Sequence, residues 1–159
     1  MRTVTIDTNL VAARELIQEA RAAGLNVAIV STSGRELEAS DIRTSDVDVI
    51  LELAVFNESR FGQAVLASDA DAENFEAALR IISGGSFPRR GHRDKLSRGE
   101  RHQLRDAQII ATHASTGRDV FITDDRRGFF CHGRQQELEQ RLGIRILTSA
   151  EFRTLLAAR

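Results

Sequence analysis

The hydrophobic positions of the chain follow two alternating spacings, one typical of buried strands and the other typical of helices. The strand pattern covers residues 2–7, 26–31, 47–56, 63–68, 119–125 and 144–147. The helix pattern covers residues 9–24, a short stretch after Ser33, 71–85, 97–115, 134–142 and the chain after 148. Strands separated by helices predict βαβ units. We therefore expect an α/β fold, a three-layer α/β/α sandwich with a central, mostly parallel sheet.

Local signals refine two parts of this pattern. Ser97 with Glu100 and Thr148 with Glu151 have the spacing of capping boxes, which predicts helix starts at both places. A polar break around Gly62 separates two apolar segments, so residues 47–68 predict a β-hairpin. Its apolar residues fall on both faces, and we expect a peripheral insertion that a partner or a second copy of the chain covers.

The composition is that of a globular protein. At 159 residues and 42% hydrophobic residues, the chain is long and apolar enough for one domain over residues 1–159. No apolar run is long enough to span a membrane, and the first residues lack the basic and apolar segments of a signal peptide. With Cys131 as the single cysteine, we expect a reducing, cytoplasmic location and no membrane partner.

The near-zero net charge of −1 hides a basic segment. Residues 86–105 hold 7 basic and 2 acidic residues, whereas residues 1–85 hold 7 basic and 14 acidic ones. Such a segment on an acidic chain is either a contact for a polyanion or a solvated loop and helix face. Under the first interpretation, the candidate RNA-binding residues are Arg89, Arg90, Arg93, Lys95 and Arg98.

Acidic residues follow the predicted strands. Asp7 ends the first strand, and Asp124 and Asp125 end the strand at 119–125. Glu36 lies in the short helix after the second strand, and Asp106 lies in the helix that Ser97 opens. Each acid alone has an ordinary explanation as a helix cap, a strand-ending turn or a solvated charge. Because ligands of open parallel sheets bind beyond the carboxyl ends of the strands, these acids can also converge there.

A convergent set of carboxylates has a specific chemical consequence. The charges repel, so the groups stay ionised together only with a cation among them. Oxygen ligands without cysteine select Mg²⁺ or Mn²⁺. Metal ions held in this way serve the hydrolysis of phosphodiester bonds, and the basic segment would then hold a phosphate backbone.

Two other kinds of site are weighed against this one. A zinc site could use His92, His102, Asp106 and His113. An Asp-based phosphotransfer domain also places acids at strand ends, but it needs a lysine near the phosphate. Lys95 is the single lysine of the chain and lies in the basic segment.

Four motifs, in order and over nearly the whole chain, resemble a known family. They are IDTN (6–9), VSTSGREL (30–37), RDAQIIATHA (105–114) and FITDDRRGF (121–129), followed by RLGIRILTSAEF (141–152) as a closing strand and helix. The chain resembles the PIN-domain family and, within it, the VapC-like toxin ribonucleases of bacterial toxin–antitoxin pairs.

This resemblance implies a metal-dependent endoribonuclease. The catalytic acids would be Asp7, Glu36, Asp106 and Asp125, and Mg²⁺ or Mn²⁺ would be bound by Asp7, Asp106 and Asp125 or its neighbour Asp124. Thr123 and Asn9 would support the site. The implied partners are the RNA substrate, a cognate antitoxin protein and a second copy of the chain in a homodimer. A non-catalytic PIN-like module that binds RNA or protein is the alternative.

Overall fold

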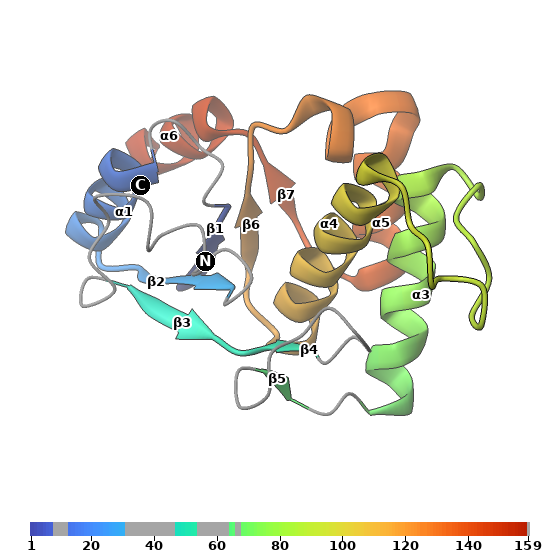
Figure 1. The fold of residues 1–159 in the computed structure, drawn as a ribbon. Coiled ribbons are helices and arrows are strands. Elements are labelled where there is room, and N and C mark those ends of the chain that lie inside the picture. Colours follow the sequence, from blue (N-terminus) through green and yellow to red (C-terminus); the bar gives the residue numbers. More distant parts are fainter. Residues whose placement is uncertain (8–12, 31–46, 54–63, 66–67, 159) are drawn as a thin grey trace.

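Figure 1 shows a computed structural model of the chain, which describes residues 1–7, 13–30, 47–53, 64–65 and 68–158. Its strands are β1 (Thr3–Ile6), β2 (Asn26–Val30), β3 (Asp48–Ile50), β4 (Glu52–Leu53), β5 (Ala64–Val65), β6 (Val120–Ile122) and β7 (Ile146–Leu147). Its helices are α1 (Ala13–Ala22), α3 (Asp69–Ser83), α4 (Arg98–Ser115), α5 (Arg134–Leu142) and α6 (Ser149–Ala157), with short helical turns η2 (Arg126–Phe130) and η3 (Cys131–Gly133) before α5. Strands and helices alternate in the first and last parts of this order, whereas β3, β4 and β5 are successive strands and α4 directly follows α3.

Five strands of the described part form one parallel sheet in the order β3-β2-β1-β6-β7. The middle strand, β1, pairs with β2 on one side and β6 on the other, so that Val4 lies opposite both Val27 and Val120. One half of the sheet thus consists of β1, β2 and β3, and the other half consists of β6 and β7. The prediction of an α/β fold with a mostly parallel central sheet is confirmed.

Helices cover both faces of this sheet (Figure 1). On one face, Val4, Ile6 and Ile122 pack with α1 and with Phe152 of α6 in one hydrophobic cluster. Phe121, which lies between Val120 and Ile122 on β6, packs on the opposite face of the sheet. It belongs to a second hydrophobic cluster, together with residues of α3, α4 and α5. This alternation, with both faces buried, agrees with a three-layer arrangement. Within the described residues, no helix has both the length and the apolar character needed to cross a lipid bilayer.

The predicted helix starts are confirmed at two places. The Ser97 and Thr148 side chains accept hydrogen bonds from the N–H groups of Glu100 and Glu151, and both capping boxes are complete. Helix α3 begins at Asp69, two residues before the predicted start, because Ser68 caps it and Asp71 completes a third capping box.

The prediction of a β-hairpin over residues 47–68 is wrong for the described part of that segment, because its strands pair in parallel. Strand β3 extends the central sheet in parallel with β2, and β4 pairs with β5 in parallel. The N–H of Leu53 bonds to Thr112 Oγ1 at 3.1 Å, and its carbonyl accepts from Gln108 Nε2 at 2.8 Å. Buried polar side chains of α4 therefore hold β4 in place. The prediction failed because an alternating apolar pattern indicates a strand but does not indicate whether its partner runs parallel or antiparallel.

Candidate active site

The carboxyl ends of β1 and β6 lie next to each other at the centre of the sheet. After β1 the chain continues to α1 on one face, and after β6 it continues through η2 to α5 on the other (Figure 1). Open parallel sheets bind their ligands where neighbouring connections leave in opposite directions. The topology therefore marks the ends of β1 and β6 as the place for a functional site.

Asp7 and Thr123, the residues directly after these two strands, are joined to each other. Asp7 is buried at 4% exposure, and its N–H continues the strand pairing by donating to the Ile122 carbonyl at 2.9 Å. The fully buried Thr123 donates its hydroxyl to Asp7 Oδ2 at 2.7 Å. The same hydroxyl accepts the N–H of Asp125 at 3.1 Å. One side chain thus fixes the carboxylate after β1 relative to the backbone after β6.

Asp125 is held by the turn that it begins. Its Oδ1 accepts the N–H groups of Arg127 and Gly128, both at 3.0 Å, and so caps the π-helical turn η2. Phe129 of this turn is buried, and its ring centroid lies 5.5 Å from that of Phe121 on β6. The turn is therefore anchored to the sheet, and it fixes one oxygen of Asp125 while the other faces Gly128.

Asp106 reaches the same point from α4. A Cβ placed on Gly128 would lie 2.7 Å from Asp125 Oδ2 and 3.3 Å from Asp106 Oδ2. The two carboxylates thus both lie close to a residue that has no side chain. Asp106 stands two turns beyond Arg98 and one turn beyond His102, on the same stripe of the helix. Three segments that are distant in sequence place Asp7, Asp106 and Asp125 around the ends of β1 and β6.

We expect the variant Gly128→Ala to lose at least about tenfold in affinity for Mg²⁺ or Mn²⁺, the loss that follows when groups around a metal site are displaced. The added methyl group would push Asp125 Oδ2 from its position, while the Oδ1 bonds resist the movement. Gly128 does not have a positive φ, so alanine fits its backbone. Calorimetry with Mn²⁺ measures the effect, and Gly99→Ala on α4, which meets no atom within 4 Å, is the matched control. Equal Mn²⁺ affinities of the two variants would contradict this geometry.

The adjacent acid, Asp124, points to a different partner. Its two carboxylate oxygens accept hydrogen bonds from Ser149, one from the N–H at 2.9 Å and one from the hydroxyl at 2.7 Å. Asp124 therefore ties the end of β6 to the first residue of α6. Of the two neighbouring acids that the sequence left open, Asp125 is the one that faces Asp106.

Two predicted site residues, Asn9 and Glu36, lie outside the described residues. Among the described ones, no three or more Asp, Glu, His or Cys side chains form a group compact enough to hold a metal ion. The histidines and Asp106 of the suggested zinc site do not form such a group. His113 is fully buried, with Nδ1 2.9 Å from Thr5 Oγ1, whereas His102 is exposed.

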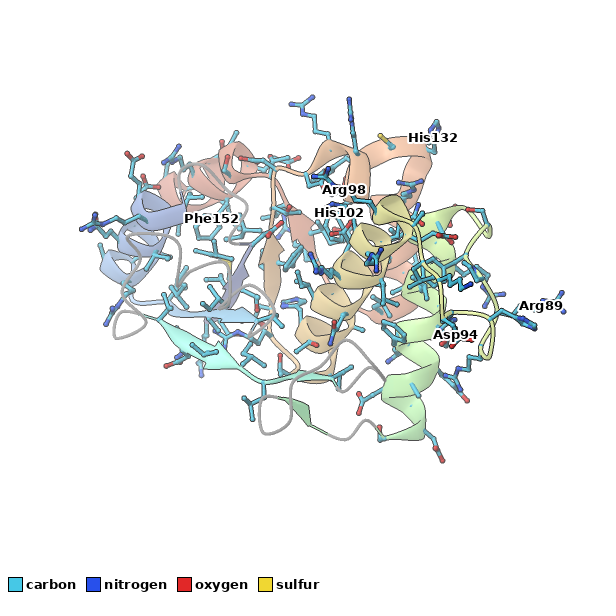
Figure 2. The ribbon with its side chains drawn as sticks, in the orientation of Figure 1. Arg89, Asp94, Arg98, His102, His132 and Phe152 are labelled. Atoms are coloured by element: carbon cyan, nitrogen blue, oxygen red, sulfur yellow. The ribbon has the colours of Figure 1, made fainter. Side chains whose placement is uncertain are left out.

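The predicted RNA-binding residues fall into two separate places. Arg98 lies with His102 in the first part of α4, whereas Arg89 projects from the outer loop beyond α3 (Figure 2). Arg90 and Arg93 both bind Glu76 of α3, Arg93 through two bonds of 2.8 and 2.9 Å. Lys95 is exposed in the same loop. The basic segment is thus not one continuous surface, and part of its charge is paired with α3.

Sequence reasoning missed the residues that shape the turn after β6. Gly128 leaves room for the two carboxylates, and Arg134 Nη1 donates to the carbonyl of Arg127 at 2.6 Å, which stabilises the turn. The signal was present in the sequence, because an aspartate three residues before a glycine can cap a helical turn. The exposed Arg126 and Arg127 place two more cations beside the acids.

The sequence was also compared with known proteins. Neither the models of known protein families nor the curated protein sequences contain a match to this chain.

Proposed function

We propose that the protein is a metal-dependent endoribonuclease that hydrolyses phosphodiester bonds of RNA with Asp7, Asp106 and Asp125. The observation that carries the proposal is the meeting of Asp106 and Asp125 at Gly128, with Asp125 linked to Asp7 through Thr123. The site lies at the carboxyl ends of two adjacent central strands, where this class of sheet binds its ligands.

The donor set fits Mg²⁺ or Mn²⁺. All three acids offer oxygen, and carboxylates that face each other are more stable with a cation between them. Mg²⁺ keeps several of its water molecules and binds through one or two carboxylates together with substrate phosphates. Asp106 and Asp125 would therefore suffice for one ion, with Asp7 beside them, and a compact cage of three protein ligands is not required.

The residues around the acids have distinct roles in this proposal. When bound, the metal would supply charge for the scissile phosphate and lower the pKa of a water molecule. Thr123 orients Asp7, and the N–H groups of Arg127 and Gly128 orient Asp125. Arg98 on α4 and the exposed Arg126 and Arg127 would neutralise the phosphates on either side. The expected products carry 5′-phosphate and 3′-hydroxyl ends.

We expect the purified protein to cleave single-stranded RNA in the presence of Mg²⁺ or Mn²⁺ and to stop when EDTA is added. The assay follows an end-labelled RNA on a gel, and it compares wild-type protein with the Asp125→Asn variant to exclude a contaminating nuclease. Binding of the RNA without cleavage in any divalent ion would favour the non-catalytic binding module. Cleavage that continues unchanged in EDTA would contradict the proposal.

The resemblance to VapC-like toxins adds three proposals about the cellular role: a cytoplasmic location, a cognate antitoxin as protein partner, and a homodimer. One observation supports the dimer. Val49 on the edge strand β3 is 43% exposed, and Leu51, the residue directly after this strand, is 46% exposed. Exposed apolar side chains on an edge strand are typical of a surface that pairs or becomes covered. Sedimentation should show a dimer, and a monomer at all concentrations would contradict it.

A further inference from the structure

A cavity lies away from the acidic site, between the latter half of α3 and the loop that follows it. Its volume is about 330 Å³, and it is lined by Glu76, Leu79, Arg80, Ser83, Gly85, Phe87, Pro88, Arg89, Arg90 and Arg93. Helix α4 lies between α3 and the sheet (Figure 1). None of the acids assigned above lines it.

Glu76 and Arg93 form the fixed part of this cavity. The Arg93 guanidinium donates two bonds to the Glu76 carboxylate and a third, through Nε, to the Pro88 carbonyl at 3.0 Å. Arg93 is 22% exposed, and its hydrogen bonds hold the pKa of Glu76 below the ordinary value. The pair ties the loop to α3, and the single carboxylate of the lining is thereby already neutralised.

The other arginines keep donors available for a ligand. Arg90 bonds to Glu76 through Nε alone and is 67% exposed, and in the described structure its two terminal nitrogens donate to no protein group. The side chains of Arg80 and Arg89 likewise make no hydrogen bond or ion pair with described residues. The N–H of Gly85 donates a hydrogen bond to the Arg80 carbonyl and is therefore not available to a ligand. Three guanidinium groups are thus the donors that the cavity offers.

We propose that this cavity binds the phosphate group of a nucleotide unit. Guanidinium groups match phosphate oxygens through paired hydrogen bonds, and four arginines against one paired carboxylate favour an anion. Phe87, Pro88 and Leu79 add an apolar wall for the rest of the ligand, and the volume lies at the lower end of the range of small-molecule sites. The nucleotide is either free or one unit of an RNA strand, and the site does not depend on the hydrolysis proposed above.

Binding measurements in EDTA test this proposal separately from cleavage. The probes are AMP, adenosine without its phosphate, and a short single-stranded oligoadenylate. We expect wild-type protein to bind a phosphate-bearing probe and to ignore adenosine, and the double variant Arg80→Gln/Arg90→Gln to weaken binding by about tenfold for each arginine. The salt dependence of oligonucleotide binding should fall by about one unit of slope for each lost contact. Arg14→Gln, which removes an exposed arginine of α1, is the matched control.

The outcomes separate the two sources of the nucleotide. Loss of AMP binding in the double variant shows a site for the free nucleotide, and a loss seen with the oligonucleotide alone shows a site for an RNA strand. If the double variant unfolds, Arg89→Gln provides the same test, because the Arg89 side chain makes no hydrogen bond or ion pair with described residues. Equal affinities of wild type, the cavity variants and Arg14→Gln for all probes would overturn the proposal.

Discussion

Asp7→Asn and Asp106→Asn should each reduce the rate of RNA cleavage by at least about a hundredfold. Each change keeps the shape of the side chain and removes one negative charge from the place where the metal would bind. Metal stabilisation of charge in the transition state is worth several kcal/mol, and about 1.4 kcal/mol corresponds to a factor of ten in rate. Single-turnover cleavage of a labelled RNA at saturating Mg²⁺ measures the loss.

Two further aspartates make this test specific. Asp119→Asn removes an acid at the opposite end of the sheet, where Asp119 accepts the N–H groups of Arg2 and Thr3. It should lower stability and leave the cleavage rate of the folded protein unchanged. Asp124→Asn should also keep the activity, because Asp124 bonds to Ser149. Wild-type rates for both Asp7→Asn and Asp106→Asn would show that the chemistry lies elsewhere.

The second large effect concerns stability in acid. His113 is fully buried between α4 and the sheet, its ring centroid is 5.6 Å from that of Phe121, and Nδ1 contacts Thr5. Burial, followed by the charge of Arg118, lowers the pKa of His113 to about 3. The unfolded chain takes up this proton near pH 6.5, whereas the folded protein does not until about pH 3. The free energy of unfolding should therefore fall by up to about 1.4 kcal/mol for each pH unit below 6.5.

The variant His113→Gln isolates this contribution, because glutamine can also form a hydrogen bond with Thr5 Oγ1 but cannot titrate. Urea unfolding of both proteins between pH 7 and 4 gives the difference in stability at each pH. We expect wild type to lose its advantage over the variant as the pH falls. Stability curves that run parallel below pH 6.5 would show that His113 is protonated in the folded protein.

The sequence predicts the elements whose physical cause is local. The β-branched and apolar runs of β1, β2 and β6 are buried on both sides, and the boxes at Ser97 and Thr148 cap their own helices. The places of Asp7 and Asp125 also follow from local pattern, because the carboxyl ends of parallel strands meet at one edge.

The features that the sequence does not predict depend on packing between distant segments. Strand β4 is held at Leu53 by Gln108 and Thr112, more than fifty residues away on α4. Glu76 receives Arg90 and Arg93 because the loop folds back on α3, which divides a basic segment that is continuous in sequence. The requirement for glycine at Gly128 becomes visible when Asp106 and Asp125 are placed on either side of it.

Anomalous diffraction from crystals of the protein soaked in Mn²⁺ shows directly where the metal binds. We expect a manganese peak beside Asp106 and Asp125 at the carboxyl ends of β1 and β6, and we expect no such peak in crystals of Asp125→Asn. A peak at another place, or no peak in crystals of a protein that cleaves RNA in Mn²⁺, would contradict the assignment of these acids as the metal site.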